Sequence, residues 1–329
     1  MNGEKILVVE DEWVVADQIC SSLEGFGFKV CKTASTGDEA IRQVEIERPN
    51  LILMDIVLKG KMNGIEAAEQ IALQSEIPVI YLTAYTKPEY IERAKQTKPF
   101  GYLVKPFKEQ ELYSNIEMAL YKHRADKNVK DYLERLAKCF HGTIEAVSEA
   151  VELRGPYPSG HHRRVAELSQ AVAREMELED FDTAGLRIAA YVYDISFVNI
   201  PAYILQDSEQ LTGLMLALYR KYPRWSYDIL KEVDFPWSVA DIVLQHRECF
   251  DGSGFPQGIK GKDILIEARV LAVADAMEDL TSHRSYRDAF PLNKALEDIS
   301  TNSGKKYDPE VAAACLRLFK EKGYRPKLI

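Results

Sequence analysis

Three acidic residues follow short apolar runs in the first part of the chain. Glu10 and Asp11 come directly after residues 5–9 (KILVV), and Asp55 follows residues 51–54 (LILM). If these runs are parallel strands, their carboxyl ends meet at one edge of a sheet, so the three carboxylates converge there. Converging carboxylates repel one another and need a cation, and a site made only of oxygen ligands suits Mg²⁺. An aspartate beside that cation can act as a nucleophile toward phosphate and form an acyl phosphate.

Two more side chains at strand ends would complete such a site. The run 77–82 (IPVIYL) leads to Thr83, and the run 100–104 (FGYLV) leads to Lys105. A hydroxyl and an ammonium at these positions would contact the oxygens of a newly formed phosphoryl group. Any one of the acidic residues alone would be an ordinary solvated surface group. Together, each at a strand end, the five positions predict a site that accepts phosphate.

The elements that must position this site follow from the spacing of the apolar runs. As far as about residue 107, amphipathic stretches of helical period separate short continuous apolar runs, at 5–9, 28–31, 51–54, 77–82 and 100–104. Continuous apolar strands that alternate with helices are typical of a parallel sheet covered on both faces. The sequence therefore predicts a doubly wound, five-stranded α/β domain.

The strand signals stop after residue 107, and a long helical pattern follows. Residues 108–153 contain no proline and one glycine, Gly142. Apolar residues recur there at steps of three and four, close to a heptad: Val129, Leu133, Leu136, Phe140, Ile144, Val147 and Val151. This stripe is consistent with a helix packed on its own domain and also with a helix that pairs with a second copy in a homodimer. Beyond Gly155 the pattern is helical, with a glycine-rich loop at 251–261, which predicts an all-α second domain.

The composition is that of an ordinary soluble protein. The chain has 329 residues, enough for two domains with substantial cores, and 46% of them are hydrophobic. The net charge of −9 argues against general binding to nucleic acid, which needs a basic face, so we expect no DNA partner. The five cysteines are scattered and form no CxxC pair, as in a protein with reduced thiols. Because no signal-like segment and no bilayer-length apolar run is evident, we expect a cytoplasmic protein with no membrane partner.

The strand-end residues resemble those of the receiver domain of bacterial two-component response regulators, over roughly residues 4–122. The resemblance implies a Mg²⁺ site, phosphorylation by a sensor histidine kinase and a relay of the change. The residues that it assigns are Glu10, Asp11 and Asp55 as Mg²⁺ ligands, Asp55 as phosphoacceptor, and Thr83, Lys105 and Tyr102 as switch residues. The segment after the phosphoacceptor, IVLKGKMNG, is longer than the usual loop and lacks its proline, and Lys105-Pro106 resembles a cis peptide common in the family.

Four segments in the second half resemble the HD-GYP phosphodiesterases, metal enzymes that cleave the bacterial second messenger cyclic di-GMP. They are 152–165 (ELRGPYPSGHHRRV), 191–197 (YVYDISF), 246–256 (HRECFDGSGFP) and 269–287 (RVLAVADAMEDLTSHRSYR), and the resemblance covers about residues 141–323. It implies a two-metal centre, of which the retained ligand positions are His161, Asp194, His246 and Asp275. Arg284 and Arg287 stand where the family has basic residues that contact phosphate.

Three ligand positions of that family hold other residues in this chain. Tyr193, Tyr222 and Arg247 stand where histidines are expected. Neutral tyrosine is a poor replacement for imidazole, and a guanidinium has no lone pair to donate to a metal. Arg247 beside Asp194 or His246 would repel a dication while it pairs with the freed carboxylates. We therefore expect the three residues to fill and neutralise the old cavity, which leaves one divalent transition metal at most, or none.

These patterns predict a response regulator in three parts: a receiver domain at 1–122, a linker helix at 123–153 and an HD-GYP-like domain at 154–329. Phosphorylation would shift the receiver between two conformations, and the linker helix would pass the shift on. The favoured output is noncatalytic, through protein contacts or through cyclic di-GMP held by the arginine pair. The alternative is an active cyclic di-GMP phosphodiesterase that works with one metal or with rearranged ligands. Histidines outside the ligand positions, such as His162, are expected to face solvent.

Overall fold

The computed structural model describes residues 3–84, 93, 95–155, 157–205, 211–283 and 287–325. The chain divides into two units, Met1–Leu136 and Ala137–Ile329. Helix α5 (Glu109–Glu152) runs through this division without a break. The domain boundaries expected after residues 122 and 153 stay predictions.

The first unit is built on a parallel sheet made from the five apolar runs. Its strands are β1 (Lys5–Val9), β2 (Lys29–Val30), β3 (Leu51–Asp55), β4 (Val79–Thr83) and β5 (Gly101–Val104). Their order is β2-β1-β3-β4-β5, and every neighbouring pair is parallel. The predicted doubly wound α/β fold is confirmed. In this order β1 and β3 are neighbours at the centre of the sheet, so the loops that follow them lie side by side at its carboxyl edge.

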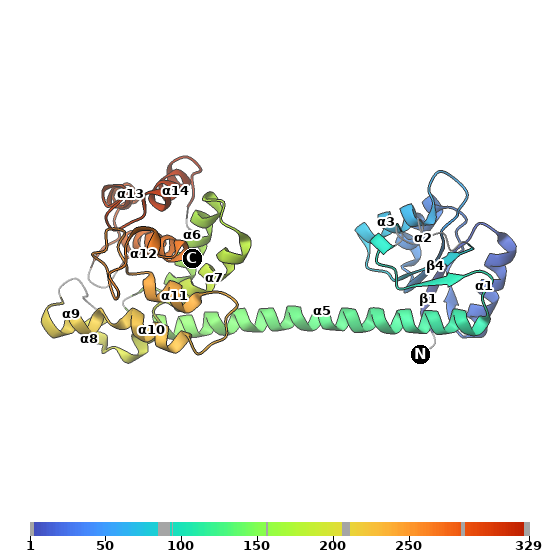
Figure 1. Ribbon diagram of the computed structural model, residues 1–329, viewed down its shortest axis with the longest axis horizontal. Helices are drawn as coiled ribbons and strands as arrows, with labels where there is room; N and C mark the ends of the chain where they lie inside the picture. The colour runs from blue at the N-terminus through green and yellow to red at the C-terminus, as the bar shows by residue number, and fades with distance from the viewer. Residues whose placement is uncertain are drawn as a thin grey trace. The chain divides into compact units, whose positions relative to one another are not determined.

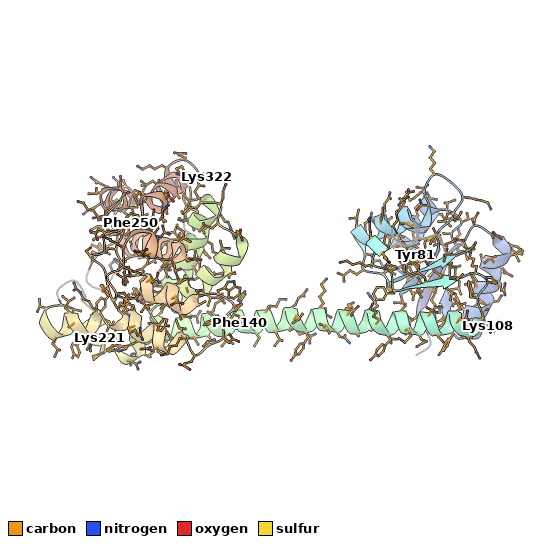
Figure 2. The ribbon with its side chains drawn as sticks, viewed as in Figure 1. Tyr81, Lys108, Phe140, Lys221, Phe250 and Lys322 are labelled. Carbon is orange, nitrogen blue, oxygen red and sulfur yellow. The ribbon has the colours of Figure 1, made fainter. Side chains whose placement is uncertain are left out.

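Helices lie on both faces of this sheet (Figure 1). They are α1 (Trp13–Gly25), α2 (Gly37–Glu47), α3 (Gly64–Gln74) and the first turns of α5. One buried cluster joins α1 and α5 to the sheet through Ile19, Leu23, Leu112, Ile116, Ile6, Leu53 and Ile80. The other joins α2 and α3 to the opposite face through Ala40, Val44, Ile65, Ile71, Leu7, Ile52 and Tyr81. Tyr81, labelled in Figure 2, is fully buried in this second cluster.

Helix α5 is 44 residues long, and its apolar stripe is exposed over much of its length. Val129 and Leu133 are each 59% exposed, Leu136 is 48% exposed and Phe140, labelled in Figure 2, is 40% exposed. By contrast, Val151 near the end of the helix is buried. Of the two interpretations of the stripe, packing on its own domain therefore holds only for the last turns.

The second unit consists of helices and loops, with no strand among the residues that the structure describes there. The confirmed all-α unit contains α6 (His161–Glu175), α7 (Asp180–Val192), η1 (Ile195–Asn199), α8 (Ala202–Leu205), α9 (Gly213–Tyr219), α10 (Tyr222–Leu230), α11 (Val239–Gln245), η3 (Gly261–Asp263), α12 (Ile266–Thr281), α13 (Leu292–Thr301) and α14 (Pro309–Lys320). None of the described helices in either unit combines the length and the apolar surface that crossing a bilayer would require.

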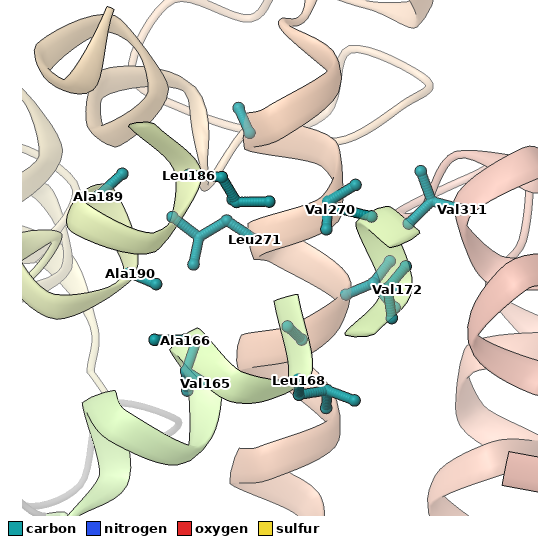
Figure 3. Packing of buried hydrophobic residues seen from close by; sticks show 14 of the residues in the cluster. Val165, Ala166, Leu168, Val172, Leu186, Ala189, Ala190, Val270, Leu271 and Val311 are labelled. Atoms are coloured by element: carbon teal, nitrogen blue, oxygen red, sulfur yellow. The ribbon is translucent and has the colours of Figure 1, made fainter. Parts of the chain in front are cut away.

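The core of the second unit lies between α6, α7, α12 and α14. Val165, Leu168 and Val172 of α6 pack in one cluster with Leu186 of α7 and with Val270 and Leu271 of α12 (Figure 3). Val311 of α14 belongs to the same cluster and is also labelled there. These helices carry the retained ligand residues His161 and Asp275, so the core holds the two residues in fixed positions.

Candidate functional sites

The predicted acidic site is assembled at the carboxyl edge of the sheet. Glu10 and Asp11 follow β1, and Asp55 is the last residue of β3. One carboxylate oxygen from each of the three residues lies within 4.8 Å of the others. Glu10 and Asp55 are buried, whereas Asp11 is partly exposed. Oxygen ligands at this spacing fit Mg²⁺, the cation that the sequence predicts.

The ammonium of Lys105 lies between two of these carboxylates. Its Nζ lies 2.5 Å from Oδ2 of Asp55 and also donates a hydrogen bond to Glu10. Burial disfavours the charge of Lys105, but the hydrogen bonds to Asp55 and Glu10 outweigh burial and raise the pKa of the ammonium. Burial raises the pKa of the Glu10 carboxyl, and the hydrogen bond from Lys105 only partly offsets this effect. The Lys105–Pro106 peptide is cis, as the family resemblance implies.

The two other predicted switch residues lie on the neighbouring strands. Thr83 ends β4 and is buried, and its carbonyl oxygen accepts a hydrogen bond of 2.8 Å from the backbone N–H of Lys105. Tyr102 of β5 stacks against Tyr81, with ring centroids 5.9 Å apart. The hydroxyls of Tyr81 and Thr97 lie 2.9 Å apart, and burial raises the pKa of Tyr81 to about 12. The edge of the sheet thus brings Thr83 and Lys105 to the acidic site, and Tyr102 contacts the adjacent strand.

A glycine that the sequence analysis did not single out fixes the start of α3 against the phosphoacceptor. A Cβ on Gly64 would lie 1.8 Å from the carbonyl oxygen of Asp55. Helix α3 can begin there because Asn63 and Glu66 form a capping box around its first amides. The loop after Asp55 is unusually long, yet it ends where the backbone of Gly64 closely approaches the backbone of Asp55. Only glycine allows this approach.

In the second unit, Tyr193 lies between two retained ligand residues. Nε2 of His161 lies 2.6 Å from the Tyr193 hydroxyl, which donates a hydrogen bond of 2.7 Å to Oδ1 of Asp275. Nδ1 of His161 hydrogen-bonds to Glu278. All four side chains are buried. Both ring nitrogens of His161 are thus occupied by protein partners.

Arg247 pairs with the other carboxylate oxygen of Asp275. We call the cluster of His161, Tyr193, Tyr222, His246, Arg247 and Asp275 the altered metal cavity, because its side chains contact one another where the family has metal ligands. One terminal nitrogen of the Arg247 guanidinium lies 2.9 Å from Oδ2 of Asp275, and its Nε lies 2.5 Å from the hydroxyl of Tyr222. That hydroxyl lies 2.8 Å from Nε2 of His246, whose Nδ1 lies 2.6 Å from the carbonyl oxygen of Val243. Since a guanidinium only donates, Tyr222 accepts from Arg247 and donates to His246. The lone pair that His246 would offer a metal is therefore used by Tyr222.

The charges in this cavity compensate one another without a metal. Burial opposes the charge on His161, but Glu278 and Asp275 outweigh it and raise the pKa of the imidazole to about 9. Burial likewise opposes ionisation of Asp275, but Arg247 and His161 hold the pKa of this carboxyl far below its usual range. Burial and the adjacent Arg247 lower the pKa of His246 to about 4. At neutral pH His161 is cationic, Asp275 is anionic and His246 is neutral.

Asp194, the other retained aspartate, has partners that the sequence analysis did not predict. Its Oδ2 accepts a hydrogen bond of 2.6 Å from the Tyr157 hydroxyl and lies 3.7 Å from Nε2 of His162. The expectation that His162 faces solvent is wrong, because its side chain is fully buried. It lies in the first turn of α6, one residue after His161, and its ring is buried against Ser148 and Glu152 of α5. Glu278, the partner of Nδ1 of His161, lies three positions after Asp275 on α12, so the helical period places the two acidic residues on the same side of that helix.

The retained ligand residues do not form a metal site in this arrangement. A metal site needs at least three ligand side chains whose ligand atoms lie close together. Among the described residues, Glu10, Asp11 and Asp55 form such a group, with ligand atoms within 4.8 Å of one another, and the retained residues of the second unit do not. His161, His246 and Asp275 instead direct their ligand atoms at protein donors and acceptors. The donor set therefore does not fit the two metals that the family resemblance implies.

The structure also describes parts of two further predicted features, the GYP-like loop and the arginine pair. The loop that resembles the GYP motif is held against Arg247, since the backbone N–H of Phe255 donates to the Arg247 carbonyl at 3.2 Å. Arg287, one of the two predicted phosphate contacts, donates a hydrogen bond of 2.8 Å to the Asp279 carbonyl, and its guanidinium lies 4.5 Å from the ring centre of Phe290. Arg284, the other one, lies outside the described residues.

Comparison with protein families assigns both parts of the chain. A model of the response regulator receiver domain matches residues 6–117, and a model of the HD domain matches residues 145–311. The two matched ranges contain the acidic site and the altered metal cavity, respectively.

The chain is also similar to named proteins, to two of them along nearly its whole length. It is 30% identical to a protein named cyclic di-GMP phosphodiesterase from Thermotoga maritima, over 96% of this chain and 90% of that protein. It is 27% identical to the cyclic di-GMP phosphodiesterase response regulator RpfG from Xanthomonas campestris, over 96% of this chain and 88% of that protein. A third relative, the 3′3′-cGAMP-specific phosphodiesterase 3 of Vibrio cholerae, is 30% identical over 52% of this chain and 37% of that protein.

Proposed function

The chain belongs to the response regulators that join an N-terminal receiver domain to a C-terminal HD domain of the HD-GYP type, and from this premise we propose a phosphorylation-controlled regulator whose output domain does not hydrolyse cyclic di-GMP. The observation that carries the proposal is the guanidinium of Arg247, paired with Asp275 at 2.9 Å and with Tyr222 at 2.5 Å. A permanent cation at this position repels a dication and uses the carboxylate that the metal would need.

In the receiver, we propose that Asp55 accepts a phosphoryl group from a sensor histidine kinase. Glu10, Asp11 and Asp55 would hold Mg²⁺, which neutralises charge on the incoming phosphoryl oxygens. An oxygen of the Asp55 carboxylate would attack the phosphorus; the P–N bond to the kinase histidine breaks, and the product is an acyl phosphate on Asp55. Lys105, already within 2.5 Å of Asp55, and the hydroxyl of Thr83 would bind the new phosphoryl oxygens. Tyr102 would follow the change from the adjacent strand.

Mass spectrometry of the intact chain tests the receiver function. After incubation with acetyl phosphate and Mg²⁺, we expect a mass gain of one phosphoryl group that Asp55→Asn abolishes. Glu69→Gln, a change at an exposed acidic residue of α3, is the matched control and should leave the gain intact. Phosphorylation that survives in Asp55→Asn would refute the assignment of the phosphoacceptor.

A second candidate function, cyclic di-GMP hydrolysis, is favoured by the names of the relatives and by the four retained ligand residues His161, Asp194, His246 and Asp275. We propose instead that the output domain acts by contact with a downstream protein or by binding cyclic di-GMP without turnover. Metal content separates the two functions. We expect at most one tightly bound transition metal per chain by elemental analysis, whereas two per chain would favour the hydrolase.

We also propose that a second copy of the chain covers the exposed stripe of α5. Val129, Leu133, Leu136, Phe140 and Val147 follow one another at steps of four, three, four and seven, and each is at least 38% exposed. Apolar residues at this spacing are the a and d positions of a two-stranded coiled coil. Exposed apolar side chains over this length are unfavourable in water, and an identical helix in register would bury them.

Light scattering of the full 329-residue chain tests the dimer. We expect a dimer in the wild type and a monomer in Leu133→Lys/Leu136→Lys, because lysines at both core positions place like charges in the seam. Glu134→Lys, at the adjacent exposed position, should leave the dimer intact. If the wild type is a monomer both with and without a phosphate mimic on Asp55, the proposed homodimer is refuted.

A further inference from the structure

The last two turns of α5 reach into the altered metal cavity, although the middle of the same helix is exposed. Ser148, Val151 and Glu152 are 3%, 4% and 7% exposed, respectively. Val151 packs in one cluster with Phe197 and with Tyr222, one of the residues that replace metal ligands. The helix that leaves the receiver thus ends as part of the wall of this cavity.

Glu152 caps the helix that carries two histidines of the cavity. Helix α6 begins after Gly160, which has no side chain to cap it. Instead, Oε2 of Glu152 accepts a hydrogen bond of 2.8 Å from the N–H of Gly160, and Oε1 accepts one of 2.7 Å from the N–H of His162. The first amides of a helix lack partners within the helix and favour a negative charge. Burial opposes ionisation of Glu152, but the hydrogen bonds from His162 outweigh it and lower the pKa of this carboxyl.

The ring of His162 continues the contact from α5 to Asp194. Its Nδ1 lies 3.0 Å from the Ser148 hydroxyl and 3.3 Å from Oε1 of Glu152. Its Nε2, on the opposite side of the ring, lies 3.7 Å from Oδ2 of Asp194. His162 is fully buried, so the ring has no room to turn independently of its neighbours.

We propose that Glu152 and Ser148 are positioning residues that make the end of α5 control the first turn of α6 and the Asp194 carboxylate. This inference rests on the proposed function, since it takes the phosphorylated receiver as the source of the movement. Because α5 is one unbroken helix, a shift or rotation at its receiver end reaches Glu152 without an intervening loop. A displacement of about 1 Å would stretch both capping bonds beyond hydrogen-bond length, so the first turn of α6 must follow α5 or lose its cap.

Hydrogen exchange of the full chain, read on peptides that contain residues 160–165, tests the cap. In Glu152→Ala we expect these amides to exchange on the order of 10-fold faster, the effect of losing a helix cap. Glu149→Ala, which changes an exposed residue of the same turn, should leave their exchange unchanged. Glu152→Gln keeps one acceptor and should give an intermediate rate, which guards against a variant that fails to fold. Unchanged exchange in both Glu152 variants would overturn the assignment.

Beryllofluoride with Mg²⁺, a mimic of the acyl phosphate, tests the transmission. In the wild type it should change the exchange of residues 160–165, and Glu152→Ala should lose this response while the receiver peptides around Asp55 keep theirs. A merely structural role of Glu152 would leave the response in place. If the receiver peptides respond and residues 160–165 do not, the transmission is refuted and the proposed function stands. If Asp55 takes no phosphoryl group in the mass assay, the proposed function fails, and the exchange of Glu152→Ala still decides whether this residue caps α6.

Discussion

Replacing Arg247 by methionine should destabilise the output domain by about 2–3 kcal/mol. The change keeps an unbranched apolar stem but removes the guanidinium that pairs with Asp275, whose side chain is 3% exposed. Removing one partner of a buried ion pair costs about 3–5 kcal/mol. We expect less because the guanidinium is 29% exposed and because Asp275 keeps its hydrogen bond of 2.7 Å from Tyr193. Adding Asp275→Asn should recover part of the loss, since no uncompensated charge then stays buried.

Urea unfolding followed by tryptophan fluorescence measures this change for the output domain alone. Trp13, the tryptophan of the first unit, is 78% exposed, so a Trp13→Phe background leaves Trp225 and Trp237 of the second unit as reporters. Arg224→Met, which breaks an exposed pair with Asp228 at 3.5 Å, is the matched control and should cost less than about 1 kcal/mol. A loss in Arg247→Met no larger than in this control would refute the view that Arg247 replaces the metal charge.

Three further outcomes follow from the contacts described. Gly64→Ala should slow phosphorylation of Asp55 at least about 10-fold, because the new Cβ would lie 1.8 Å from the Asp55 carbonyl oxygen. Gly25→Ala, whose Cβ would have nothing within 4 Å, is the control and should keep the wild-type rate. Equal rates in the two variants would contradict the close contact at Gly64. The pKa of His161 rises from 6.5 in the unfolded chain to about 9 in the folded chain. Its charge therefore contributes its full share to the free energy of unfolding below pH 6.5, and this contribution is lost as the pH rises through 9. The difference in unfolding free energy between wild type and His161→Gln should therefore shrink by about 3 kcal/mol between pH 6.5 and 9, and a constant difference would refute the charged state. The triple variant Tyr193→His/Tyr222→His/Arg247→His restores histidine at the replaced positions and should raise the metal content toward two per chain, measured by elemental analysis. An unchanged metal content would show that the cavity cannot accept metals.

The sequence was sufficient for the receiver because its chemistry lies at strand ends. Continuous apolar runs predicted the strands, and a parallel sheet places the residues after β1 and β3 at one edge whatever the loops do. Glu10, Asp11 and Asp55 meet there as expected. The role of Gly64 could not be predicted, because in a single sequence the only sign that two backbones approach closely is the glycine itself.

The altered cavity could be predicted only in outline. The residue types at positions 193, 222 and 247 predicted that the metal ligands were replaced, and the hydrogen bonds of Arg247 to Asp275 and Tyr222 agree with that expectation. The partners that satisfy the retained ligands come from segments far apart in sequence, such as Glu278 for His161 and Tyr157 for Asp194. The period of the apolar residues predicts which face of a helix is buried. It does not predict which polar group of another helix lies opposite a given buried side chain. For that reason buried His162 was expected at the surface.

The stripe on α5 shows a different limit. The spacing of the apolar residues from Val129 to Val151 predicted a helix with one apolar face. The spacing alone does not determine which part of the protein, or which second copy, packs against that face. In the structure Val151 is buried within the second unit, whereas Val129 and Leu133 are each 59% exposed. One continuous pattern therefore serves two different contacts, which only the three-dimensional packing distinguishes.

Turnover of cyclic di-GMP by the full 329-residue chain, purified and reloaded with Mn²⁺ or Fe²⁺, is the most direct test of a noncatalytic output domain. The Thermotoga maritima relative, named as a cyclic di-GMP phosphodiesterase, serves as the positive control. Without a second metal the reaction loses a water activator and a charge clamp, so we expect no linear product above a rate of about 0.01 s⁻¹, with or without beryllofluoride on Asp55. Linearisation at about 1 s⁻¹ or faster, with two metals bound per chain, would contradict the proposal and establish the chain as an active phosphodiesterase.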